Sequence, residues 1–116
     1  MSKTLDFTKA KKRFLTVKLD DAEETVLCVN MPNKATYEQL FECGKELDKM
    51  NGTASPEEVQ GAITAMYEAV AVAMSNNKQG KRFTASDLET MFDIDDLMLF
   101  FTTYMDFVGE IASEKN

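Results

Sequence analysis

The chain has 116 residues, a formal net charge of −7 at pH 7 and no histidine. Its length fits a single domain over residues 1–116, and its hydrophobic fraction of 44% argues against intrinsic disorder. The lack of histidine removes the commonest general base and metal ligand, and the five glycines are scattered without forming a phosphate-binding loop. We therefore expect no enzymatic activity, no cofactor and no metal site.

Charge is divided unevenly along the chain. Residues 1–18 carry six Lys and Arg against one Asp, a net of +5, and the other residues carry seven Lys and Arg against 19 Asp and Glu, a net of −12. The strongly acidic part of the chain after residue 18 would repel the phosphates of a nucleic-acid duplex, so we expect no nucleic-acid partner. No apolar run approaches the ~18–20 residues that cross a bilayer, and the charged N-terminus lacks the apolar stretch of a secretory signal. We expect no membrane association and a soluble cytoplasmic protein, with Cys28 and Cys43 as free thiols.

Two short segments that follow a basic arm over residues 1–13 predict β-strands. In the first, Leu15, Val17 and Leu19 alternate with polar residues, which is the period of a half-buried strand. The second is rich in β-branched side chains. The sequence thus predicts a β-hairpin over residues 14–31, and its apolar face must pack on another element because an isolated hairpin is marginally stable in water.

Beyond the hairpin, apolar residues at spacings of three and four indicate helices over residues 33–113. Thr36 followed by Gln39 fits a capping box at the start of the first helix, and Ser55 predicts the start of the second. Residues 75–82 form a polar loop in which we expect no core residue. The sequence therefore predicts an α+β fold with an N-terminal β-hairpin packed beside a bundle of three to four α-helices.

The last predicted helix is more broadly apolar than one core-facing stripe requires. Phe100 and Phe101 would point about 100° apart on a helix, so both cannot face one narrow core seam. Seven methionines besides the first stand mostly on helical apolar stripes, where they suit either core filling or an adaptable binding surface. We predict a partner-binding surface on the helix from Leu97 to Ile111 and on the second helix. The candidate residues are Met66, Met74, Met98, Phe101, Tyr104 and Met105.

Two stretches of the chain are similar to motifs of a known family. The first comprises Leu5-Asp6-Phe7-Thr8-Lys9, Phe14-Leu15-Thr16-Val17 and Val29-Asn30-Met31-Pro32. The second comprises Met74-Ser75-Asn76-Asn77-Lys78-Gln79-Gly80-Lys81, Phe83-Thr84-Ala85-Ser86-Asp87-Leu88, Asp95-Asp96-Leu97 and Tyr104-Met105-Asp106-Phe107. In these stretches the chain resembles the small tail assembly chaperones of long-tailed phages and prophages of Firmicutes.

The resemblance implies a non-enzymatic chaperone that acts in the cytoplasm of the bacterial host and is absent from the finished virion. It implies binding to the tape-measure protein and to the major tail protein that builds the tail tube. Two alternatives remain open: a structural tail or neck component retained in the virion, and a small phage regulatory protein that binds a host partner. The sequence also leaves self-association open.

Overall fold

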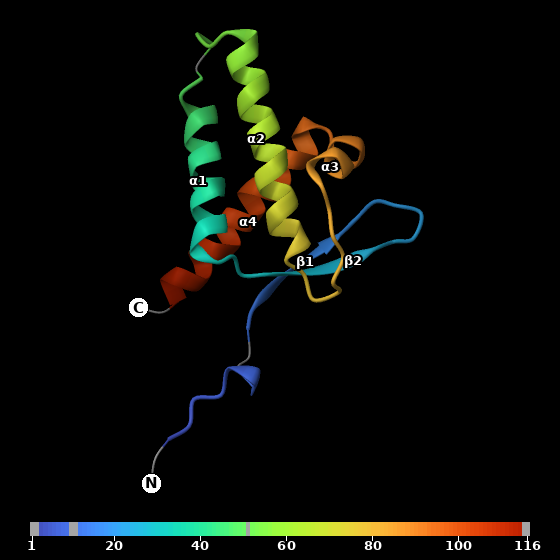
Figure 1. Ribbon diagram of the computed structural model, residues 1–116, viewed down its shortest axis with the longest axis vertical. Helices are drawn as coiled ribbons and strands as arrows, with labels where there is room; N and C mark the ends of the chain where they lie inside the picture. Colours follow the sequence, from blue (N-terminus) through green and yellow to red (C-terminus); the bar gives the residue numbers. More distant parts are fainter. Residues whose placement is uncertain (1–2, 10–11, 51, 115–116) are drawn as a thin grey trace.

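The computed structural model describes residues 3–9, 12–50 and 52–114, in which a β-hairpin precedes four α-helices (Figure 1). The elements in chain order are the single 3-10 turn η1 (Phe7–Lys9), β1 (Phe14–Lys18), β2 (Val26–Asn30), α1 (Lys34–Asp48), α2 (Pro56–Ser75), α3 (Ala85–Met91) and α4 (Ile94–Glu114). This arrangement confirms the predicted α+β fold with a hairpin beside helices. Residues 1, 2, 10 and 11 of the predicted basic arm, and the side chain of Ile111, lie outside the description.

The hairpin forms one antiparallel sheet whose apolar face packs on the helices. Leu15 pairs with Val29, and Val17 pairs with Leu27. The two β2 side chains of these pairs are fully buried and the two β1 side chains are half-buried, whereas the alternate residues of β1 are exposed. The period of two read from the sequence thus marks the face that meets the core.

The helix starts follow from local capping, with one correction to the prediction. The hydroxyl of Ser55 accepts the backbone N–H of Glu58, and the Glu58 carboxylate accepts the N–H of Ser55, so the predicted start of α2 is confirmed. α1 begins earlier than predicted. Its N-cap is Asn33, whose Oδ1 accepts the N–H of Thr36 at 2.9 Å. The predicted capping box of Thr36 with Gln39 is wrong, because the asparagine supplies the capping oxygen one turn earlier.

The helices enclose the core against one face of the hairpin. Figure 1 shows α1 and α2 side by side, with α4 crossing behind them and the hairpin below the C-terminal end of α2. Residues 3–9 extend away from this body (Figure 1). Fully buried side chains come from β2 and from each of the four α-helices. The largest are Leu27, Val29, Leu40, Met66, Val70, Met74, Leu88, Leu97 and Tyr104.

The loop between α2 and α3 is fixed by a buried asparagine. The Nδ2 atom of Asn77 donates to the carbonyl oxygens of Met74 and Lys81, both at 2.7 Å, and its Oδ1 accepts the N–H of Lys81 at 3.0 Å. Asn77 is only 9% exposed, and these bonds satisfy its amide. Residues 75–82 contribute nothing to the apolar core, as expected, but Asn77 is buried all the same, because a polar side chain can be buried when its hydrogen bonds are made.

Candidate protein-binding groove

Three of the six predicted partner-binding side chains lie in the core. Met66, Met74 and Tyr104 are 0% exposed. The Tyr104 hydroxyl donates to the Asn30 carbonyl oxygen at 2.8 Å and so joins α4 to β2, and burial raises the pKa of this phenol. A partner cannot touch these side chains on the folded chain. Their apolar spacing reflects core filling, and this corrects the prediction for the three residues.

The other three candidates, Met98, Phe101 and Met105, are half-buried on one flank of α4. The ring of Phe101 lies against α1, where a Cβ atom at Gly44 would fall 2.6 Å from the ring Cζ atom. Phe101 and Met105 also pack against the buried cluster. The contact with α1 accounts for the burial of Phe101, and a binding role for Met98, Phe101 and Met105 stays a prediction.

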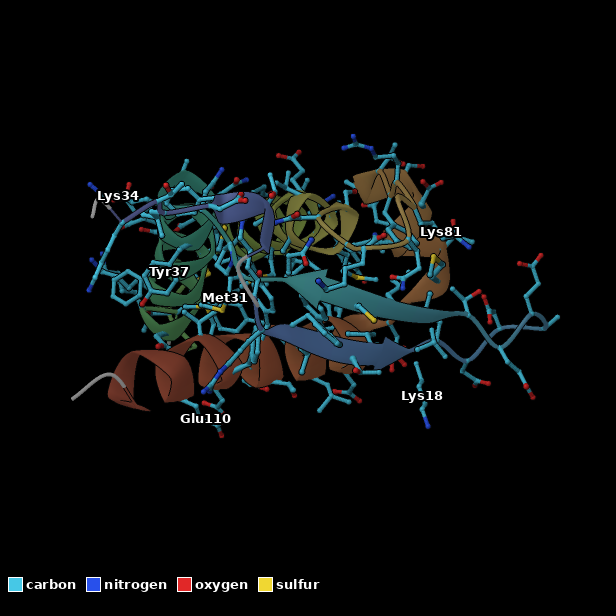
Figure 2. All side chains as sticks on the ribbon, turned by 90° about the horizontal axis from the view of Figure 1, so that it is seen from below. Lys18, Met31, Lys34, Tyr37, Lys81 and Glu110 are labelled. Carbon is cyan, nitrogen blue, oxygen red and sulfur yellow. The ribbon has the colours of Figure 1, made fainter. Side chains whose placement is uncertain are left out.

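The opposite flank of α4 faces a groove that sequence reasoning missed. The groove has a volume of about 610 Å³ and lies between β1 and the corner formed by α3 and α4. Figure 2 shows α4 running alongside β1. The walls of the groove are formed by residues 15–21 of the hairpin, residues 90–92 at the end of α3, and residues 96, 99, 100 and 103 of α4. The groove thus joins a strand edge to a helical surface.

Two large apolar side chains of the groove are open to solvent. Leu99 is 67% exposed and Met91 is 41% exposed, while Phe100 beneath them is buried. A partner that covers them would gain ~25 cal/mol for each Å² of apolar surface removed from water. The available sequence signal was Leu99 itself, an apolar residue on the side of the helix that the core stripe leaves to solvent.

β1 presents an unpaired edge to the same groove. The backbone N–H of Cys28 donates to Gln79 Oε1 at 2.8 Å, and its carbonyl oxygen accepts the N–H of Lys78 at 2.9 Å, so these groups point away from β1. Thr16 stands opposite Cys28 in the antiparallel register, and its N–H and C=O therefore point toward the other edge. By the same alternation the backbone groups of Lys18 point there too. Within the described residues β1 pairs with β2 alone, and such a free edge can accept an added strand.

Acidic side chains dominate the charged part of the groove wall. Asp20, Asp21 and Asp96 line it, against Lys18 as the one basic residue of the described lining. The hydroxyl and the N–H of Thr25 donate to the Asp21 carboxylate at 2.6 and 2.8 Å, and these bonds lower the pKa of that carboxyl below its usual value. The groove is therefore suited to an apolar segment that also carries positive charge.

A second hollow, of about 770 Å³, lies between α2 and the loop before α3. Its walls are mainly polar, and Val72 is its exposed large apolar side chain. This hollow exposes one large apolar side chain, so it offers less to an apolar partner than the first groove, which exposes both Leu99 and Met91. Val72 instead provides a matched control for substitutions at Leu99.

No family model, curated protein or solved structure gives a significant match to this chain. In the part of the chain that the structure describes, no group of three or more Cys, Asp and Glu could hold a metal ion. No helix there is long and apolar enough to span a membrane. The groove between β1 and the α3–α4 corner is thus the feature of the described residues that best suits a molecular partner.

Proposed function

We propose that this chain is a non-enzymatic protein that binds apolar segments of other proteins in the groove between β1 and the α3–α4 corner. The observation that carries the proposal is that Leu99, 67% exposed, stands beside the free edge of β1. An apolar floor offers affinity through burial, and the edge of Thr16 and Lys18 offers directional hydrogen bonds. Acidic residues on the wall favour segments with Lys or Arg.

The specific role that we propose is that of a phage tail assembly chaperone in the cytoplasm of the bacterial host, with the tape-measure protein and the major tail protein as clients. The resemblance of the sequence to this family supports the role. Two of the resembling stretches also contribute residues to the groove wall: residues 14–17 belong to β1, and residues 95–97 lie at the start of α4.

The physical properties of the chain suit such a client. A tape-measure protein is a long helix whose apolar stripes are exposed until the tail tube surrounds it. Covering a stripe at one groove after another would hide that surface, and the net charge of −7 would keep the complex soluble. A stable contact of this kind buries on the order of 1,000 Å² in total, so the groove would form the centre of a larger footprint.

Co-expression with the tape-measure and major tail proteins of a long-tailed phage of Firmicutes tests the proposal. We expect the tagged chain to capture one or both clients, and Leu99→Asp to weaken capture by about tenfold or more, since a buried leucine contributes ~1.5–3 kcal/mol. Val72→Asp, which changes an exposed apolar residue outside the groove, should capture as well as the wild type. Equal capture by both variants would contradict the proposed site.

Mass spectrometry of purified virions separates this role from the structural alternative. A chaperone leaves the assembly before the particle is complete, so we expect none of its peptides in virions that contain the tape-measure and tail-tube proteins. Its presence in stoichiometric amounts would identify a tail or neck component instead.

A further inference from the structure

The arm before β1 carries apolar surface that the body of its own chain leaves open. Leu5 is 78% exposed and Phe7 is 70% exposed, more than any other large apolar side chain described. Within residues 3–9, the N–H and the hydroxyl of Thr8 donate to the nearby Asp6 carboxylate at 2.9 and 2.5 Å. Figure 1 shows the arm extending away from the helices and the hairpin.

The sequence of the arm has the pattern of a strand that would fit the groove. In an extended conformation Lys3, Leu5, Phe7 and Lys9 fall on one face, since alternate residues of a strand point to the same side. This face has two apolar side chains in the middle and a lysine at each end. The single turn η1 must open for the arm to extend, and one 3-10 turn is weakly held.

The groove is complementary to this face in length, polarity and charge. Residues 3–9 span about 23 Å when extended, enough to run along the whole of β1, whose five residues span about 17 Å. The exposed Leu99 and the neighbouring floor would receive the two apolar side chains of the arm. Asp20, Asp21 and Asp96 on the wall would attract its lysines.

We propose that residues 3–9 of a second copy of this chain bind in the groove as a strand added to the free edge of β1. The outward N–H and C=O groups of Thr16 and Lys18 would form the ladder. Asp6 would then lie on the outer face of the sheet, the face that carries the exposed alternate residues of β1, Lys18 among them. A second copy is the occupant because residues 3–9 extend away from the body of their own chain, where Leu5 and Phe7 are exposed to solvent and do not cover their own groove.

This inference rests on the proposed function, because it uses the same groove, and it adds a way in which client binding would be regulated. An arm seated in the groove covers Leu99 and the edge of β1, and a client must displace it to bind. The donor and acceptor surfaces differ, so two copies either exchange arms or join head to tail. In both arrangements the arm competes with clients for one surface.

Light scattering coupled to size-exclusion chromatography of the full chain, over a range of concentrations, tests the inference. We expect concentration-dependent association that weakens by about tenfold or more in Leu99→Asp and in the double variant Leu5→Asp/Phe7→Asp. Val72→Asp should associate as the wild type does, and thermal unfolding should show that all variants are folded. A wild type that is monomeric throughout, or an arm variant that associates normally, would overturn the inference.

Mixing the variants gives a second, sharper readout. The double variant Leu5→Asp/Phe7→Asp keeps an intact groove, and the Leu99→Asp variant keeps an intact arm. An equimolar mixture of the two should therefore form a dimer that neither variant forms alone. A mixture that stays monomeric would overturn the inference even if both variants are defective singly. No client is present in this test, so its failure leaves client binding intact, whereas loss of client capture with normal association would remove the proposed function alone.

Discussion

The ring of Phe101 on α4 lies against Gly44 of α1, so closely that a Cβ atom at position 44 would fall 2.6 Å from the ring Cζ atom. The glycine gives the ring its space between the two helices. With this flank of α4 packed toward α1, the opposite flank, which carries Leu99, faces β1 and forms one wall of the groove. The contact of Phe101 with Gly44 thus sets which apolar residues of α4 remain accessible.

Gly44→Ala should destabilise the fold relative to a matched helical substitution. The added methyl group forces the Phe101 ring out of place, and overpacking typically costs ~1–3 kcal/mol. Gly61→Ala on α2 is the control, because a Cβ atom there meets nothing within 4 Å and alanine should stabilise the helix by ~0.5–1 kcal/mol. Urea unfolding of both variants measures the difference. If Gly44→Ala is as stable as Gly61→Ala, the ring does not occupy this space.

Because Asn33 is the N-cap of α1, alanine substitutions at Asn33 and at Thr36 should affect stability to different extents. Asn33→Ala removes the oxygen that accepts the Thr36 N–H and should lower the free energy of unfolding by ~1 kcal/mol. Thr36→Ala leaves that bond in place, and its effect should stay within ~0.5 kcal/mol. Chemical denaturation of the two variants checks this order. A larger loss in Thr36→Ala would restore the capping box read from the sequence.

Substitution of Asn77 should loosen the loop from the hairpin. Asn77→Ala leaves the carbonyl oxygens of Met74 and Lys81 without their donor, and an unsatisfied buried group costs ~1–3 kcal/mol. Asn77→Asp should be at least as damaging at neutral pH, because a carboxylate places acceptors where two donors are needed. Hydrogen exchange of the Asn30 and Lys78 amides, which bond across this junction, should accelerate in both variants. Unchanged exchange and stability would contradict the role of Asn77.

Stability should fall at alkaline pH through buried tyrosines. Burial raises the pKa of Tyr104 and, with nearby carboxylates, that of Tyr67, so the folded state holds these phenolic protons more tightly than the unfolded state. Their contribution is complete below the unfolded pKa of about 10 and is lost as pH rises above it. Denaturation between about pH 7 and pH 11 should show this loss, and Tyr104→Phe should reduce it. An alkaline profile that is identical in Tyr104→Phe would contradict the assignment.

The features that sequence reasoning predicted correctly depend on residues close together in the chain. The alternation of Leu15 and Val17 defines a strand face by itself, and the cap at Ser55 needs only a residue three positions later. The error at α1 is local too, since Asn33 and Thr36 both have side chains that cap helices well. Local sequence patterns therefore predicted the strands and helices. They gave the wrong N-cap for α1, where two nearby residues are both good capping residues.

The candidate site could not be read in the same way because it depends on contacts between distant residues. Met66 and Met98 both stand on apolar helical stripes, and only the packing of the helices decides that one is fully buried and the other half-buried. Gln79 and Lys78, which are far from the hairpin in sequence, bond to the outer edge of β2. The edge of β1 is therefore the one edge of this two-stranded sheet that stays unpaired within the described residues. Leu99 became a candidate only when its neighbours across the groove were known.

Under the proposed function, client proteins bind in the groove at Leu99. A photo-crosslinking amino acid placed at position 99, and in separate chains at positions 72 and 98, tests it most directly when each chain is co-expressed with the tape-measure protein. We predict a covalent adduct with the client from position 99 and none from position 72. Adducts from position 98 alone, or equal yields from positions 99 and 72, would show that clients bind elsewhere on the chain.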